Sequence, residues 1–262
     1  MAPYDNPFST GGPGCIIILI DQSANTGVKE APAISMQVNR ILGNLLIRNT
    51  KEGRIIPRVL VGMYGYSGAG VNWAAPGLSP NSEGLVSISD VNETVEREYF
   101  DEEKEEYIPL FVPEQAFGDA PIVPALEKAR EIAESFAQSH PNSFPPVVIN
   151  ITAGDFGHLV ERDFLSACFD ITKVGTSDGA SLMIHGKVNS QSKTTAFFPT
   201  SPEGLDASSN LLFQASSMMP NQAIKLLQSN WGWDLGTYPR LFAENTDFTE
   251  FLRSILWVDY LT

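Results

Sequence analysis

The sequence predicts an α/β fold: a doubly wound, mainly parallel sheet flanked by helices, arranged as a three-layer sandwich. Short aliphatic and β-branched runs, such as residues 15–20 and 147–152, are typical of strands that are buried on both faces. Segments with apolar residues three and four positions apart, such as residues 31–49 and 121–140, are typical of amphipathic helices. The two kinds of segment alternate along the chain, which favours a parallel sheet covered by helices on both sides.

The elements are expected in a simple order. A Pro/Gly-rich irregular arm covers residues 1–14, and a single domain covers residues 15–262. The strand Cys15–Ile20 ends at Asp21, and the helix Ala31–Asn49 and the strand Arg58–Tyr66 follow. The other expected strands are 85–88, 106–112, 147–152, 181–188, 196–198 and 240–243, and the other expected helices are 121–140, 161–174, 210–218, 221–228 and 246–256.

The charge balance is strongly acidic. Lys and Arg total 17 against 31 Asp and Glu, which gives a formal net charge of −14. Such a chain repels polyanions, so we expect neither nucleic acid nor an anionic membrane as a partner. Part of the excess lies between Asp90 and Glu106. That run is typical of a solvated loop or hairpin, and a cation site or a docking surface for a basic partner are the alternatives.

Two features favour a cytoplasmic protein. Cys15 and Cys168 both lie among apolar residues and are expected to be buried free thiols, which suits a reducing compartment. The N-terminal residues lack the basic and apolar regions of a signal peptide, and the longest apolar run, Cys15–Ile20, is too short to span a bilayer.

Three loops are expected to meet at one edge of the sheet. They are residues 21–25 after the first strand, residues 117–121 before the helix 121–140, and residues 152–155 after the strand 147–152. Binding sites of open α/β sheets lie at the carboxyl ends of the strands, so these loops are the place to look for one. The candidate binding residues at this edge are Asp21, Ser23, Asn25, Asp119, Ala120, Ala153 and Asp155.

These loops resemble those of the von Willebrand factor A (vWA) family, and most closely its stand-alone bacterial members. The resemblance lies in Asp21-x-Ser23-x-Asn25 after a strand, Gly118-Asp119-Ala120-Pro121 before a helix, and the segment 144–154, over roughly residues 15–160. It implies a Rossmann-like three-layer sandwich. It also implies a Mg²⁺ adhesion site built from Asp-x-Ser-x-Ser, a Thr before the middle helix, and the Asp of a Thr-Asp-Gly loop.

The chain matches only part of that ligand set. Asp21 and Ser23 match, whereas Asn25 stands in place of a Ser, Ala120 in place of the Thr, and Ala153 in place of the Asp. Mg²⁺ requires about six oxygen ligands and loses its water reluctantly, so these changes are expected to impair the site severely. We therefore expect no cofactor, and Asp21, Ser23 and Asn25 are the residues that would hold Mg²⁺ if it bound.

Asp119 and Asp155 lie beside the substituted positions and leave two interpretations open. In the first, they are the carboxylates of a rearranged metal site. In the second, Asp119 caps the following helix and Asp155 is a turn residue. Asp21 itself can be held at the strand end by hydroxyl and amide donors without a metal.

The remaining candidates favour structural roles. His185 is expected to be a satisfied strand residue, His158 an ordinary loop residue and His140 a helix end. The glycines after Tyr66 favour a bent loop over a phosphate loop, because no Lys follows them. The pair Trp231 and Trp233 is expected to pack over the last strand, with an exposed binding anchor as the alternative.

The sequence thus predicts a non-enzymatic protein-binding domain. The resemblance implies a subunit or adaptor of a bacterial stress, regulatory or anti-phage defence system, whose partner protein is encoded nearby. A Mg²⁺-dependent adhesion protein with a rearranged site is the first alternative. A hydrolase that uses His158 near Asp21 and Ser23 is the second, and fold alone cannot decide between them.

Overall fold

A mainly parallel sheet of eight strands forms the middle layer of the computed structural model, which describes residues 4–92, 98–101, 105–190 and 194–246. Its strand order is β13-β14-β12-β9-β1-β4-β5, and β6 also pairs with β4. The five central strands are parallel: β1 (Gly14–Asp21), β4 (Val59–Ser67), β9 (Val147–Thr152), β12 (Leu182–Lys187) and β14 (Phe242–Glu244). The predicted fold class is therefore confirmed.

Antiparallel strands close both edges of the sheet. The strands β5 (Gly70–Trp73) and β6 (Val86–Ser87) pair with β4, and β13 (Ala196–Phe197) pairs with β14. Three hairpins lie outside the sheet: β2 (Thr50–Lys51) with β3 (Arg54–Ile55), β7 (Glu98–Asp101) with β8 (Glu106–Pro109), and β10 (Gly175–Thr176) with β11 (Gly179–Ala180).

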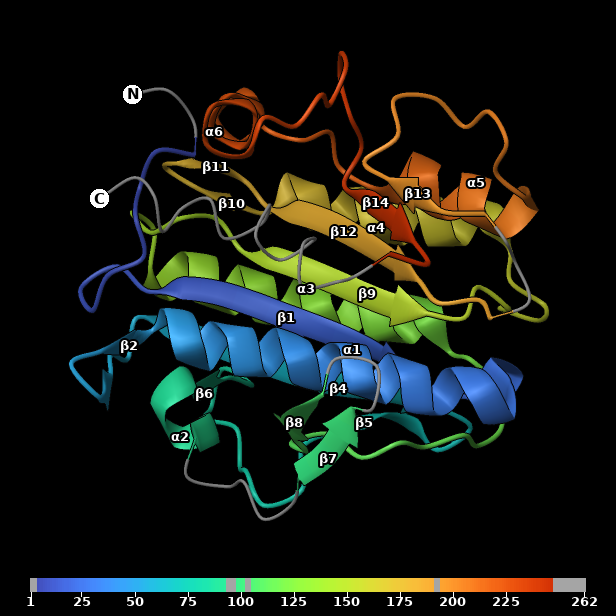
Figure 1. Ribbon diagram of the computed structural model, residues 1–262, viewed down its shortest axis with the longest axis horizontal. Helices are drawn as coiled ribbons and strands as arrows, with labels where there is room; N and C mark the ends of the chain where they lie inside the picture. Colours follow the sequence, from blue (N-terminus) through green and yellow to red (C-terminus); the bar gives the residue numbers. More distant parts are fainter. Residues whose placement is uncertain (1–3, 93–97, 102–104, 191–193, 247–262) are drawn as a thin grey trace.

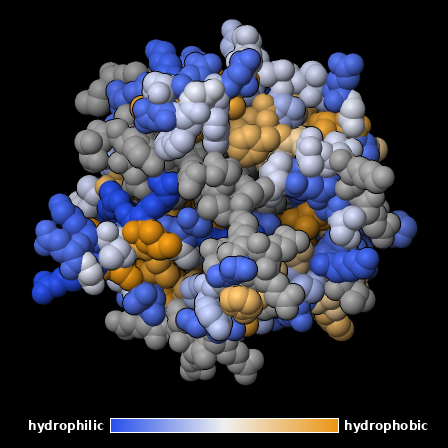
Figure 2. All heavy atoms as spheres, viewed as in Figure 1, coloured by the Kyte–Doolittle hydropathy of each residue, from blue (hydrophilic) through white to orange (hydrophobic). Residues whose placement is uncertain are grey.

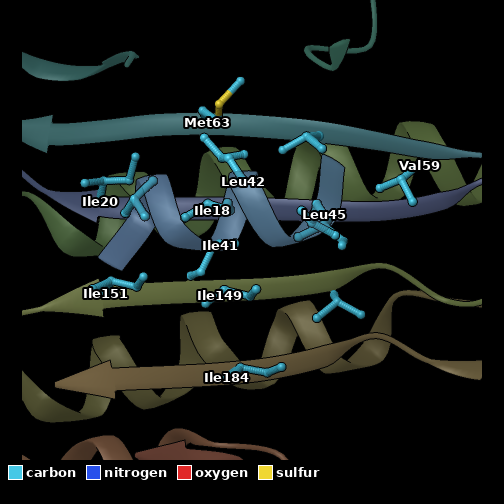
Figure 3. Close-up of a cluster of buried hydrophobic side chains, with 14 of the residues drawn as sticks. Ile18, Ile20, Ile41, Leu42, Leu45, Val59, Met63, Ile149, Ile151 and Ile184 are labelled. Carbon is cyan, nitrogen blue, oxygen red and sulfur yellow. The ribbon is translucent and has the colours of Figure 1, made fainter. Parts of the chain in front are cut away.

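Alternate residues of β1 point to opposite faces and build two cores. Ile16, Ile18 and Ile20 pack with α1 (Gly27–Arg48) and α6 (Asn221–Trp231), and Figure 3 shows the part of this core beneath α1. Cys15, Ile17 and Leu19 pack on the other face, against the three helices α3 (Ile122–Ser139), α4 (Glu161–Lys173) and α5 (Ala207–Ala215). Every residue of β1 is buried, as expected of a central parallel strand.

Several element ends differ from the sequence-based prediction. The helix expected at 210–218 is α5 at Ala207–Ala215, because the Asp206 carboxylate caps it by accepting a hydrogen bond from the Ser209 amide. The helix expected at 221–228 continues to Trp231, where Gly232 ends it in the left-handed conformation. The strand expected at 240–243 is Phe242–Glu244, because Arg240 instead forms an isolated bridge with Met218.

The segment between β5 and α3 also differs. The expected strand 85–88 is shorter, since Ile88 begins the short helix α2 (Ile88–Asn92). The expected strand 106–112 ends at Pro109, and its partner β7 makes the acidic run part of a hairpin. Of the closing helix predicted at 246–256, only Thr246 is described, so this prediction lies outside the described residues.

Several single-residue expectations are confirmed. Cys15 and Cys168 are buried free thiols. Trp231 and Trp233 are half-buried, and the Trp233 ring meets Phe197 of β13 edge-on at 5.2 Å, so the pair packs over the last strands. In the part of the chain that the structure describes, no helix combines the length and apolar character needed to cross a membrane.

Candidate functional site

The three predicted loops meet at the carboxyl edge of the sheet. Backbone hydrogen bonds join the first two: Phe117 N–H donates to the Gln22 carbonyl at 2.9 Å, and Ala24 N–H donates to the Gly118 carbonyl at 2.8 Å. The third loop joins them through Asn25, whose side-chain amide lies 3.4 Å from the Asp155 carbonyl. We call the surface formed by residues 21–25, 117–121 and 152–155 the strand-end surface; in Figure 1 it lies where the arrowheads of β1 and β9 point.

A glycine contact fixes the middle of this surface. The loop after β4 meets the 117–121 loop through a hydrogen bond of 2.7 Å from Gly68 N–H to the Phe117 carbonyl. Gly118 has a φ of +59°, and a Cβ there would lie 2.6 Å from the Gly68 Cα. Both the conformation and the close approach therefore require glycine at this position.

The Asp21 carboxylate is buried and fully hydrogen-bonded by its own chain. Its Oδ1 accepts from the Ser23 hydroxyl at 2.7 Å and from the Ser23 amide at 3.2 Å. Its Oδ2 accepts from the Thr152 hydroxyl at 2.8 Å and from the Ala153 amide at 3.4 Å. Burial raises the pKa of Asp21, and the hydrogen bonds from Ser23 and Thr152 only partly oppose that rise. This carboxylate joins the ends of β1 and β9.

The residues present do not fit a Mg²⁺ adhesion site. Both Asp21 oxygens and the Ser23 hydroxyl are engaged with each other and with Thr152. Ala120 and Ala153 offer no side-chain oxygen. Among the described residues, no group of three or more His, Cys, Asp or Glu side chains is placed to hold a metal ion. Asn25 supplies one further side-chain oxygen, but without side-chain oxygens at positions 120 and 153 the set falls short of the about six oxygen ligands that this ion requires.

The two neighbouring carboxylates do not complete such a site either. Asp155 is exposed, and its Oδ1 accepts a hydrogen bond from the Gly157 amide at 3.1 Å. It therefore stabilises its own turn, as expected if Asp155 is a turn residue. Asp119 is exposed, but the alternative that it caps α3 is wrong: Pro121 holds the N-cap position, and no side chain caps this helix.

A lysine cluster at the same edge was missed by the sequence reasoning. Lys187, the last residue of β12, is 1% exposed, and its Nζ lies 2.8 Å from Asp206 Oδ2, 2.7 Å from Ser209 Oγ and 3.4 Å from Glu244 Oε1. Burial alone would raise the pKa of Asp206, but the hydrogen bonds from Lys187 and Ser209 hold it well below its usual range. A Cβ on Gly154 would meet Lys187 Cε at 2.6 Å, so the cluster adjoins the third loop.

A second polar row crosses the sheet beneath the strand-end surface. The Tyr66 hydroxyl donates to Asn150 Oδ1 at 3.0 Å, the Asn150 amide lies 3.2 Å from His185 Nδ1, and His185 Nε2 lies 3.7 Å from Cys168 Sγ. The prediction that His185 is a satisfied strand residue is therefore confirmed. Burial lowers its pKa to about 3, so the imidazole is neutral in the folded protein.

Replacing Asp21 by alanine is expected to lower the free energy of unfolding by about 1–3 kcal/mol, because buried donors of Ser23 and Thr152 lose their acceptor. The loss should be the same in EDTA and in excess Mg²⁺, as measured by urea unfolding. The exposed Asp119 is the matched control, since Asp119→Ala should change stability by less than about 0.5 kcal/mol. A loss that appears only in the presence of Mg²⁺ would mean that Asp21 is a metal ligand.

Comparison with known proteins gives only distant likenesses. No protein-family profile and no curated protein sequence matches the chain. Similar solved structures include proximal thread matrix protein 1 from the mussel byssus (14% identity, TM-score 0.46) and a manganese-loaded TRAP protein of Plasmodium vivax (12%, 0.38). A third is the pilus adhesin SpaC of Lactobacillus rhamnosus GG (11%, 0.44). In the same order, the three alignments cover 98%, 67% and 98% of this chain. This chain spans 49%, 57% and 31% of the length of those three chains.

Proposed function

We propose that this chain is a vWA-type protein-binding domain whose strand-end surface contacts another protein without a bridging metal ion. The observation that carries the proposal is an exposed aromatic residue on a fixed loop. Phe117 is 63% exposed, and its amide and carbonyl are both hydrogen-bonded, to Gln22 and Gly68. A large side chain held rigidly at a surface is a typical anchor of protein interfaces, because little entropy is lost when it binds.

The chemistry of the surface supports binding over catalysis. Ser23 is the hydroxyl of this edge that sequence reasoning considered as a nucleophile, but it is fully buried and donates its proton to the Asp21 carboxylate. A nucleophile must reach its substrate and needs a base beside it. We therefore propose a non-enzymatic adaptor or subunit that acts with a partner protein encoded nearby, in a bacterial stress, regulatory or defence system.

The test is affinity capture of partner proteins by the full chain from a cell extract of the organism that encodes it. A partner should bind the wild type and lose at least about tenfold in yield with Phe117→Asp, because a charge replaces the proposed apolar anchor. The matched control is Phe169→Asp on α4, since Phe169 is 61% exposed but lies away from the strand-end loops. The proposal fails if capture depends on Phe169 instead, or if Phe117→Asp binds as well as the wild type.

A metal titration separates the proposal from metal-dependent adhesion. Mg²⁺ and Mn²⁺ should leave the melting temperature unchanged, and EDTA should leave partner capture unchanged, because the donor set does not fit either ion. A ligand that binds only the native state raises its stability. A clear rise in melting temperature with either ion, or loss of capture in EDTA, would favour the rearranged metal site.

A further inference from the structure

A groove beside the β7–β8 hairpin combines an apolar lining with an acidic rim. It has a volume of about 410 Å³ and lies between α1 and β8. Its apolar walls include Pro32, Met36, Ile108 and Pro113, while Glu98 and Glu114 supply the carboxylates. We call this the acidic groove. It lies next to the strand-end surface, since the Gln22 side chain donates to the Pro113 carbonyl at 3.4 Å.

The floor of the acidic groove is rigid and offers no competing polar contacts. The side-chain oxygen Oδ1 of Asn39 accepts from the backbone amides of Phe111 and Val112 at 2.7 and 2.9 Å, and its side-chain Nδ2 donates to the Val112 carbonyl at 2.8 Å. The Ser35 hydroxyl also donates to the Val112 carbonyl, at 2.7 Å. Because these polar groups already have hydrogen-bond partners, a segment bound in the groove gains binding free energy from apolar contacts on the floor and from ion pairs with the glutamates at the rim.

An exposed aromatic pair lies on the β7–β8 hairpin, which supplies Glu98 and Pro109 to the groove lining. Phe100 and Tyr107 are directly opposite each other on β7 and β8, with ring centroids 4.9 Å apart, and they are 44% and 68% exposed. Glu98 is two residues before Phe100 and therefore on the same face of β7. Aromatic faces beside carboxylates suit arginine, whose guanidinium stacks on rings and pairs with carboxylates.

The charges of the groove and of the whole chain indicate the kind of segment that binds there. The described residues that line the groove include two glutamates and neither Lys nor Arg, and the chain carries a net charge of −14. A second copy of this chain would therefore be repelled, whereas a basic segment would be attracted. On the face that carries α1, apolar side chains lie in separate patches among hydrophilic ones (Figure 2). A segment in which apolar and basic residues alternate therefore suits this face.

We infer that the acidic groove binds an arginine-containing segment of a partner protein, with an apolar side chain of that segment in the groove and its arginines at Glu98, Glu114 and the aromatic pair. The inference concerns a second surface and does not require the strand-end surface to bind anything.

The probe is a fluorescein-labelled peptide of alternating arginine and leucine, titrated with the full chain and followed by anisotropy. The double variant Glu98→Lys/Glu114→Lys should weaken binding by about tenfold or more, since it reverses both rim charges. The matched control, Glu127→Lys/Glu203→Lys, alters net charge equally at exposed positions elsewhere and should leave the affinity within about twofold. Equal weakening by both pairs would show mere attraction to an acidic protein and overturn the inference.

Three further comparisons complete the test. A peptide with glutamine in place of arginine should bind at least about tenfold more weakly, and Met36→Asn, which makes the apolar wall polar without adding a charge, should weaken binding of the arginine peptide. If Met36→Asn does not fold, the charge-reversal pairs decide alone. Phe117→Asp should leave peptide affinity unchanged, so failure of the strand-end proposal is distinguished from failure of this one. Absence of binding to the arginine peptide would also refute the inference.

Discussion

Replacing Lys187 by methionine is expected to lower the free energy of unfolding by about 3–5 kcal/mol, because it leaves a buried carboxylate without its cation. Glu244 is 0% exposed, and Lys187 Nζ lies 3.4 Å from its Oε1. The other Glu244 oxygen accepts from the Ser209 hydroxyl at 2.8 Å, which cannot neutralise the charge. Asp206 contributes less to the loss, since its side chain is 49% exposed and can be solvated.

A double variant separates the buried charge from the packing of the Lys187 side chain. In Lys187→Met/Glu244→Gln the uncompensated carboxylate is removed, so at least half of the lost stability should return. Urea unfolding of the two single variants and the double variant gives the coupling energy directly. If the double variant is as unstable as Lys187→Met, packing around the lysine stem dominates and the ion-pair account is wrong.

The sequence was sufficient to predict the central sheet because its strands are buried on both faces. The run Cys15–Ile20 contains no polar residue other than a buried cysteine, and Val147–Thr152 contains only Asn150 and Thr152 among aliphatic residues, so their composition indicates central strands. The edges were harder to predict. The strand β5 at Gly70–Trp73 is only half-buried and contains Asn72, and its pairing with β4 follows from the turn at Gly68–Ala69, which the sequence indicated only as a bent loop.

The strand-end loops show the same division between local and long-range information. Their convergence follows from parallel strands that end at one edge, which sequence order predicts. The internal pairing of Asp21 depends on Thr152, which lies 131 residues away and reads locally as the last residue of a strand. The Lys187 cluster joins β12, the turn before α5 and β14, and in sequence each member resembles an exposed charge at the end of an element. No local pattern distinguishes these residues from solvated ones.

Acidification is expected to destabilise the protein through His185. Burial lowers the pKa of this imidazole from 6.5 to about 3, so the unfolded chain takes up a proton at a higher pH than the folded one does. The resulting contribution to stability is fully present above about pH 6.5 and is lost as the pH falls towards 3, at up to about 1.4 kcal/mol per pH unit. Over the whole window the loss reaches about 5 kcal/mol.

The groups around His185 do not favour its protonation. The described residues that contact its ring are the Asn150 amide, the Cys168 thiol and the Phe164 ring, whose centroid lies 5.6 Å away, and none of these three is an anion that would stabilise an imidazolium. Asp206 adds an acid-dependent loss of the same sign, but only below its unfolded pKa of about 4, whereas the raised pKa of Asp21 acts in the opposite direction.

The measurement is the free energy of unfolding in urea between pH 7 and pH 4.5, compared between the wild type and His185→Gln. Asp206 acts below this range, and the opposite contribution of the raised Asp21 pKa is common to both proteins, so the difference between them isolates the histidine. As the pH falls over this range, the wild type should lose stability relative to His185→Gln. His185→Gln keeps a hydrogen-bonding side chain but cannot titrate, so it should be less stable at pH 7 and should show no loss of stability as the pH falls. The other two histidines serve as controls: His158 is exposed and His140 is half-buried, so His158→Gln and His140→Gln should keep the wild-type slope. A slope that survives in His185→Gln would place the titrating group elsewhere and would contradict a neutral, buried imidazole in the polar row.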